Sequence, residues 1–277
     1  MTKALPGTSK EDLISPFKIG DQPPLELSQR EPLQTVQYMG IDGCRSGWFY
    51  IGFSPDQDYQ LGILKNFREI APFLIHSQQI LVDIPIGFRD IDSQERLCDL
   101  AARKILGKRS STIFPAPVRS VLNIDNYPQA SAENDRCSGR KLSKQSWNIV
   151  AKIREVDEWL QSSLAPGIIR ECHPEICFWA LNHQTVVNSR KKTETGIEER
   201  LEILSHYCQN ARTIVTEAQS RYRRKDLAVD DIVDALACAV GATFYPALKT
   251  LPDQPERDQI GLPMEIVYPD LSSNSKD

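Results

Sequence analysis

The chain has 277 residues, a formal net charge of −4, 40% hydrophobic residues and 25% charged residues. This length can bury a sizeable core in one large or two small domains, and the acidic balance argues against a protein that coats nucleic acid non-specifically, while permitting a local basic groove. The chain has no run of 18 apolar residues, so no membrane-spanning segment is expected. The N-terminus lacks the apolar segment of a secretory signal, and the seven scattered cysteines favour reduced thiols in a cytoplasmic protein.

The two ends of the chain differ in composition from the rest. Residues 1–34 are rich in proline, serine and charge and show no hydrophobic periodicity. We expect a disordered leader there and a second loose segment over residues 271–277. Residues 35–270 are expected to form one domain.

Strand patterns dominate the first part of this domain. Residues 38–53 (YMGIDGCRSGWFYIGF) predict two strands joined by a tight turn between glycines, and residues 59–67 fit a third strand. Residues 68–76 have a short helical pattern, and residues 80–88 (ILVDIPIGF) form a buried apolar strand. Three antiparallel strands, a helix and a strand parallel to the first predict a mixed α/β sheet.

Helical patterns dominate the rest of the chain. They cover residues 93–106, 144–164, 174–181, 196–207, 211–219 and 229–245. Those at 93–106 and 144–164 lie in a long, mainly helical insertion of about residues 89–166, after which residues 168–171 fit a further strand. The last pattern, VDDIVDALACAVGATFY, is the clearest helix, with Asp230 and Asp231 in the first turn, where carboxylates suit the helix dipole.

Acidic residues recur in or beside these apolar segments, namely Asp42, Asp83, Glu171, Glu175, Asp231 and Asp234. Asp42 and Asp83 fall at the ends of two strands predicted to be parallel and adjacent, the edge at which α/β sheets place ligands. Asp231 and Asp234 are three residues apart on one helix face. Carboxylates that converge from three elements suit Mg²⁺, and two ions about 4 Å apart can activate a water and stabilise the leaving oxygen of a phosphodiester.

Structural explanations also exist for these acids. Asp230 and Asp231 could serve only as N-terminal helix charges, and Asp42, followed by glycine, could be only a turn residue. Asp83 follows a wholly apolar strand, and Asp234 lies inside an apolar helix. A surface role explains these last two poorly.

Five segments in order resemble the DUF429 family: GIDGCRSGW, VDIPIGF, AARKILGKRSSTIFPAPVR, ECHPE and DDIVDALACA. The resemblance runs over about residues 38–247. The family is a group of predicted nucleases of the ribonuclease H-like fold, so the resemblance implies a ribonuclease H-like mixed sheet flanked by helices, with a mainly helical insertion. The D-x-x-D-A pattern at residues 231–235 is also similar to the last catalytic helix of RuvC-type Holliday junction resolvases.

The resemblance also implies a set of site residues. The catalytic acids and ligands of two Mg²⁺ or Mn²⁺ ions would be Asp42, Asp83, Asp231 and Asp234. Asp83 stands where RuvC enzymes carry a glutamate. Glu171 belongs to the family motif and would be a further catalytic acid, as a ligand or a group that orients water, with Glu175 as the alternative.

Basic residues cluster in the insertion and shortly before the last helix. They could line a phosphate-binding face, although solvated helix surfaces explain isolated basic residues equally well. The candidate substrate-binding residues are Arg45, Lys108, Arg109, Arg119 and Lys152. Arg45 could instead pair with Asp42 and hold the turn. Phe114 could stack on a base, but such aromatic residues more often belong to a core.

These observations predict a Mg²⁺- or Mn²⁺-dependent nuclease that hydrolyses phosphodiester bonds in DNA or RNA. Two alternatives stay open: a non-catalytic nucleic-acid or metabolite-binding module on the same fold, and an actin-like phosphotransferase. The phosphotransferase would need a duplicated domain and glycine-rich phosphate turns. A zinc site is not expected, because the spacing of the candidate ligands does not suit a tetrahedron; they are Cys172, His173, Cys177 and His183.

Overall fold

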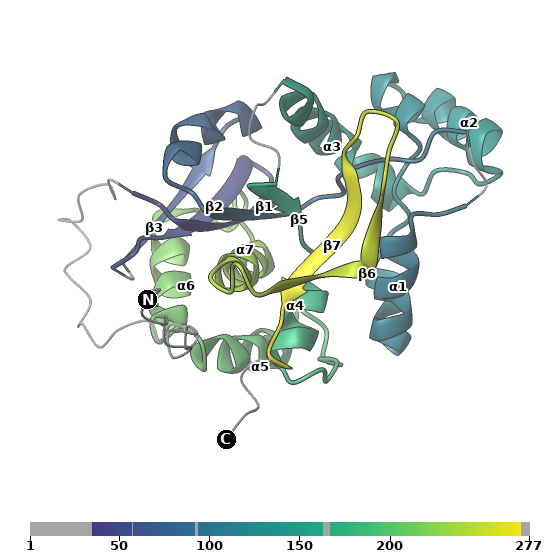
Figure 1. Ribbon diagram of the computed structural model, residues 1–277. Helices are drawn as coiled ribbons and strands as arrows, with labels where there is room; N and C mark the ends of the chain where they lie inside the picture. Colours follow the sequence, from purple (N-terminus) through teal and green to yellow (C-terminus); the bar gives the residue numbers. More distant parts are fainter. Residues whose placement is uncertain (1–34, 57, 92–93, 163–166, 273–277) are drawn as a thin grey trace, which may run out of the picture.

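A mixed five-stranded sheet forms the centre of the molecule in the computed structural model, which describes residues 35–56, 58–91, 94–162 and 167–272 (Figure 1). The strand order is β3-β2-β1-β4-β5, in which β1, β2 and β3 are antiparallel neighbours while β4 runs parallel to both β1 and β5. The strands are β1 (Tyr38–Cys44), β2 (Gly47–Phe53), β3 (Tyr59–Leu64), β4 (Gln79–Asp83) and β5 (Ile169–Glu171). The expected leader, residues 1–34, and residues 273–277 of the expected tail lie outside the described ranges.

Helices flank the sheet. The α-helices are α1 (Leu97–Leu106), α2 (Tyr127–Ser138), α3 (Lys144–Ser162), α4 (Pro174–Leu181), α5 (Glu194–Ser205), α6 (Ala211–Arg221) and α7 (Val229–Ala242). Shorter 3-10 segments are η1 (Phe67–Ile75), η2 (Gly107–Thr112) and η3 (Arg119–Asn123). The segment between β4 and β5 holds α1, η2, η3, α2 and α3, so the insertion is mainly helical, as predicted. This arrangement confirms the α/β prediction and is consistent with a ribonuclease H-like fold.

The sequence predicted no membrane-spanning helix. Within the described ranges, no helix is long and apolar enough to cross a membrane.

The alternation of side chains along β1 divides the core into two layers. Met39 and Ile41 pack in one apolar cluster with residues of α3, including Ile153. Gly40 and Asp42, one residue out of phase, face the opposite side, where α7 lies against the sheet (Figure 1). Because successive side chains of a strand point to opposite faces, Asp42 belongs to the α7 face.

Gly40 allows α7 to lie directly on β1. A Cβ atom at this position would come within 2.0 Å of the backbone nitrogen of Ala239 and 2.2 Å of the carbonyl oxygen of Ala235. A side chain at position 40 would therefore push the helix away from the strand. This close approach brings Asp234, the residue before Ala235, to the end of β1.

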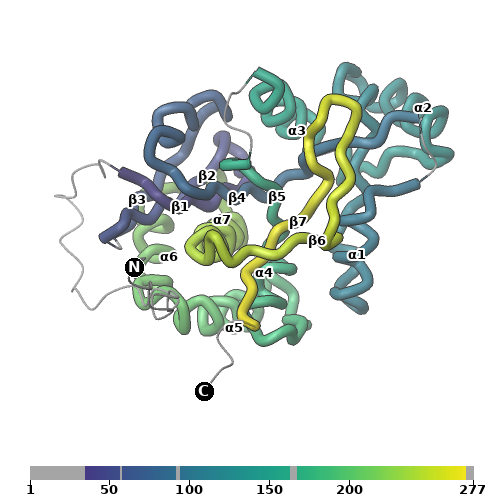
Figure 2. Tube along the Cα trace, in the orientation of Figure 1, coloured from purple at the N-terminus to yellow at the C-terminus, as the bar shows by residue number. Residues whose placement is uncertain are grey.

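A separate two-stranded sheet, β6 (Leu248–Arg257) and β7 (Pro263–Pro269), was not predicted. Its antiparallel strands form a long arm that runs beside α1 (Figure 2). The sequence did not predict this sheet because Pro252 and Pro255 interrupt β6, and proline within an apolar run argues against a strand.

Two helical segments also differ from the predictions. Helix α2 has a buried face of Ala130, Asn134 and Cys137, which gives little apolar periodicity, and it was not predicted. Helix α1 begins at Leu97, four residues after the predicted start at residue 93, which lies outside the described residues.

Candidate functional site

Two aspartates lie side by side at the ends of adjacent parallel strands. Asp42 of β1 is the register partner of Asp83 of β4. The carboxyl ends of both strands meet at this edge of the sheet, as the sequence predicted. Equal register in a parallel pair points both side chains to the same face, the one covered by α7.

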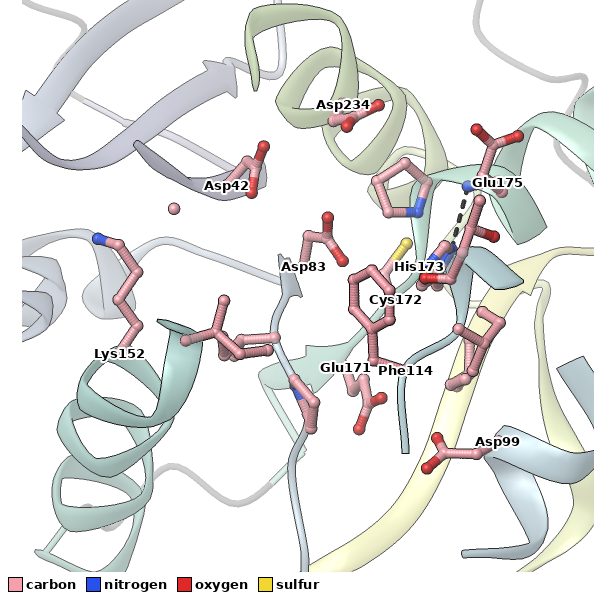
Figure 3. A pocket seen from close by; sticks show the side chains of 18 of the residues that line it. Asp42, Asp83, Asp99, Phe114, Lys152, Glu171, Cys172, His173, Glu175 and Asp234 are labelled. Atoms are coloured by element: carbon pink, nitrogen blue, oxygen red, sulfur yellow. Dashed lines mark hydrogen bonds between the residues drawn. The ribbon is translucent and has the colours of Figure 1, made fainter. Parts of the chain in front are cut away.

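Asp234 of α7 completes a triad with these two residues. One carboxylate oxygen from each of the three lies within 4.8 Å of the others. Figure 3 shows the three side chains pointing toward one another from β1, β4 and α7. All three line a cavity of about 300 Å³. We refer to Asp42, Asp83 and Asp234 as the carboxylate triad.

The triad has few protein partners. Asp42 is only 8% exposed, yet neither its carboxylate nor that of Asp83 takes part in a hydrogen bond or ion pair within the residues that the structure describes. Asp234 is 2% exposed and pairs with Lys191, whose Nζ lies 2.5 Å from Asp234 Oδ2. Buried carboxylates without partners are costly, because they lose their hydration.

Burial raises the pKa of every member of the triad. Burial, together with the charge on Asp231, raises the pKa of Asp83 to about 6, against the lowering effect of Lys191. Burial also raises the pKa of Asp234 to about 6. Asp42 has a pKa raised well above its usual range by burial and by the charges on Asp83 and Asp234. A cation in the triad would stabilise the ionised forms.

The donor set fits a hard divalent cation. All three ligands are carboxylate oxygens, which Mg²⁺ and Mn²⁺ prefer, and the triad contains no thiolate or imidazole. Two of them, Asp42 and Asp83, are free of protein hydrogen bonds within the described part of the chain, so their oxygens are available to a ligand.

Comparison with known proteins identifies the family. A family model described as a protein of unknown function (DUF429) matches residues 40–257. The chain belongs to the DUF429 family. The match confirms that the chain belongs to the family that its sequence motifs resemble. No curated protein and no solved structure matches the chain.

Asp231, the fourth acid of the DUF429 chain that was predicted as a metal ligand, lies one turn before Asp234 but outside the triad. Its Oδ2 accepts a hydrogen bond from the backbone N–H of Ala228 at 3.2 Å, so it caps the first turn of α7. Burial and the neighbouring Asp230 raise its pKa to about 6. Asp231 thus contributes negative charge near the triad while one of its oxygens stabilises the helix start.

Glu171, from the ECHPE segment of this DUF429 chain, lines the same cavity but is fully engaged. Arg96 donates to both of its oxygens, with Nη1–Oε2 at 2.7 Å and Nη2–Oε1 at 2.9 Å, and the backbone N–H of Ile86 donates at 2.7 Å. Arg96 also pairs with the buried Asp99. Burial raises the pKa of Glu171 to about 7, against the lowering effect of Arg96. Figure 3 shows its carboxylate directed away from the triad.

Glu175, the alternative to Glu171 in the DUF429 segment, is held by two arginines. Arg200 donates to both carboxylate oxygens at 2.8 and 3.0 Å, and Arg109 donates to Oε1 at 2.9 Å. The N–H of Glu175 donates to His173 Nδ1 at 3.2 Å, which caps α4 (Figure 3). These bonds fix the loop and helix beside the cavity, and they account for Arg109, which was predicted to bind substrate.

Lys152 is the member of the predicted substrate-binding set that lines the cavity. Its Nζ donates to the carbonyl oxygen of Gly47 at 2.5 Å and lies 4.4 Å from the centre of the Trp48 ring. The other four are not among the lining residues. Arg45 and Lys108 are exposed, Arg109 pairs with Glu175, and Arg119 pairs with Asp157 and Asp258.

Lys191 lines the cavity of this DUF429 protein and pairs with a member of the triad, but it was not predicted as a site residue. It lies in the segment NSRKKTET, which has no apolar pattern and no predicted element. Nothing in the sequence separates it from the adjacent Lys192, so the fold alone identifies it.

Proposed function

We propose that this protein is a metal-dependent nuclease that hydrolyses phosphodiester bonds in DNA or RNA. The observation that carries the proposal is the carboxylate triad, in which three oxygens lie within 4.8 Å of one another and Asp42 is buried without a hydrogen-bond or ion-pair partner for its carboxylate among the described residues. Mg²⁺ or Mn²⁺ bound there would polarise a phosphoryl oxygen and lower the pKa of a bound water.

Each acidic residue of the site would have its own role. Asp42, Asp83 and Asp234 would hold the cation through one oxygen each. Asp231, one helical turn away, would add negative charge and orient water. Glu171 would act as a positioning residue: its bonds to Arg96 and Ile86 fix the segment that follows Asp83 at the edge of the cavity.

Phosphate contacts fall to the basic residues around the cavity. Lys152 projects from α3 toward the turn after Asp42, so its ammonium could contact a phosphate beside the triad (Figure 3). Arg45 and Lys108 are exposed and could contact more distant phosphates of a strand. Arg109 and Arg119 already neutralise buried acids, so we assign them to the structure of the site and not to substrate.

The test is Mn²⁺ binding by calorimetry together with cleavage of single- and double-stranded DNA and RNA. We expect Asp42→Asn to weaken Mn²⁺ binding and to reduce cleavage by more than about 100-fold, because a ligand is lost while the side-chain volume is kept. Asp230→Asn is the matched control, since Asp230 lies on the same helix as Asp234 but outside the triad.

Circular dichroism would verify that both variants fold. Absence of Mn²⁺ binding by the unaltered protein would contradict the proposal, and so would full cleavage by Asp42→Asn.

A further inference from the structure

Two adjacent lysines approach the acidic site in different ways. Lys191 enters the cavity, with its Nζ 2.5 Å from Asp234 Oδ2 and its side chain 36% exposed. Lys192 stays on the surface, with a side chain that is 79% exposed and an Nζ 3.7 Å from Asp230 Oδ2. Only the first of these contacts involves a member of the carboxylate triad.

The backbone around Lys191 is fixed on both sides. Thr193 donates to the carbonyl oxygen of Arg190 through its N–H at 3.0 Å and through its hydroxyl at 2.8 Å. Thr193 Oγ1 also caps α5 by accepting from the N–H of Gly196 at 3.1 Å. Arg200 donates to the carbonyl oxygen of Ser189 at 3.3 Å. These hydrogen bonds hold the loop that carries Lys191 beside the triad.

Gly196 allows this loop to pack closely against the start of α5. A Cβ atom there would lie 2.0 Å from the carbonyl oxygen of Arg190, so the loop packs on α5 at a distance that no other residue permits. The fold thus fixes the backbone from which the Lys191 side chain reaches Asp234.

The charge of Lys191 acts on the whole site. Its ammonium pairs with Asp234 and lies in the cavity that Asp42 and Asp83 also line, and neighbouring carboxylates favour the charged form of a lysine. Three ionised carboxylates and one ammonium leave two negative charges, which one divalent cation neutralises. A second divalent cation would leave uncompensated positive charge in a buried site, which is unfavourable in a medium of low polarity.

Asp231 adds a fourth carboxylate to this count. It accepts a hydrogen bond at the N-terminus of α7, where the positive end of the helix dipole, roughly half a charge, offsets about half of its charge. With Lys191 present, one divalent cation then leaves about half a negative charge, and a second would leave about one and a half positive charges. Without the ammonium, two divalent cations would leave only about half a positive charge.

We propose that Lys191 supplies the second cationic position of the site, so that the carboxylate triad binds one divalent ion instead of two. This inference rests on the proposed function, because it requires the triad to bind metal. It revises the two-ion site that the sequence predicted. In this arrangement the ammonium of Lys191 donates a hydrogen bond to an oxygen of the phosphodiester, where a second ion would otherwise stabilise negative charge.

The experiment measures the stoichiometry of Mn²⁺ binding by calorimetry at one fixed pH. We expect one ion per chain for the unaltered protein and two for Lys191→Met, which keeps the length of the side chain but removes its charge. Lys192→Met is the matched control and should bind one ion. Lys191→Arg restores the charge and should also bind one ion, which a merely structural role of the side chain would not predict.

The outcomes separate this inference from the proposed function. Two ions in the unaltered protein, or a single ion in folded Lys191→Met, would overturn the role of Lys191 and leave the metal site in place. Binding of Mn²⁺ by none of the four proteins would remove the metal site itself and the inference with it.

Discussion

At the scale of single residues, the acids around the cavity differ in what neutralises them. Glu171 and Glu175 each receive arginine donors on both oxygens. Asp42 and Asp83 receive none from the described residues, although Asp42, like the glutamates, is buried. Neutralised acids support the structure, whereas the unneutralised ones retain the capacity to bind a cation.

The raised pKa of Asp83 makes a prediction about stability. Its pKa is about 6 in the folded protein and near 3.9 in an unfolded chain, so the folded state binds the proton more tightly. Stability from this group is therefore complete below pH 4 and is lost as the pH rises through 6. In EDTA, Asp83→Asn should match the unaltered protein near pH 4 and exceed its free energy of unfolding by about 2 kcal/mol at pH 7.5.

Urea denaturation across this pH range would measure the difference. Asp125→Asn, at an exposed ion pair of the insertion, serves as the control and should follow the unaltered protein at every pH. A constant difference between Asp83→Asn and the unaltered protein from pH 4 to 7.5 would contradict the argument.

The sequence predicted part of this picture at the residue scale. Asp42 and Asp83 could be placed at strand ends, and Asp234 on a helix, because apolar runs define those elements. The partners of the glutamates could not be predicted: Arg96 lies 75 residues from Glu171, and Arg200 lies 25 residues from Glu175. Only the packing of the insertion and of α5 brings these charges together.

At the scale of elements, the contact of α7 with β1 decides whether the triad forms. Helix α7 is buried along almost its whole length and packs mainly on β1 and β4. Gly40 sets the distance between strand and helix, and that distance determines whether Asp234 reaches Asp42 and Asp83. One glycine in an apolar strand thus controls the geometry of a site two residues away.

We expect Gly40→Ala to lower the free energy of unfolding by about 3 kcal/mol or more, because its Cβ would meet backbone atoms of α7 that cannot move independently. Gly43→Ala in the same strand is the control. Its Cβ would meet only the Lys152 side chain, at 2.7 Å, which can shift, so the expected loss is below about 1 kcal/mol. Urea denaturation measures both, and equal losses would show that α7 adapts.

Elements with strong apolar patterns were predicted well, and those without were not. Strands β1 and β4 and helix α7 carry long apolar runs. The β6–β7 arm contains prolines, and α2 buries small and polar side chains, so neither gives a regular signal. The arm nevertheless closes one side of the cavity, since Ile266 is among the lining residues.

At the scale of the whole molecule, buried ion pairs fasten the insertion and the β6–β7 arm around the cavity. Arg96 joins the start of α1 to β5 through Glu171. Arg119, at the start of η3, pairs with Asp157 of α3 at 2.8 Å and with Asp258 in the turn after β6. These contacts connect segments that are more than 35 residues apart in sequence.

Arg119 therefore offers a test between a structural and a substrate-binding role. Its side chain is 14% exposed, and those of Asp157 and Asp258 are 6% and 0% exposed. Arg119→Met would leave two buried carboxylates without their cation, so we expect the free energy of unfolding to fall by about 3 kcal/mol. Arg68→Met is the control, because Arg68 and Glu158 form a surface pair at 3.9 Å, and it should change stability by less than about 0.5 kcal/mol.

Urea denaturation and binding of a single-stranded oligonucleotide, measured on the same samples, separate the two roles of Arg119. A structural role predicts lower stability and, under conditions where the variant stays folded, unchanged affinity for the oligonucleotide. Unchanged stability with an affinity reduced about tenfold would instead assign Arg119 to phosphate binding, because one lost phosphate contact weakens binding without disturbing the core. The arm and the insertion would then be held together by their apolar packing and by other pairs such as Arg89 with Glu256.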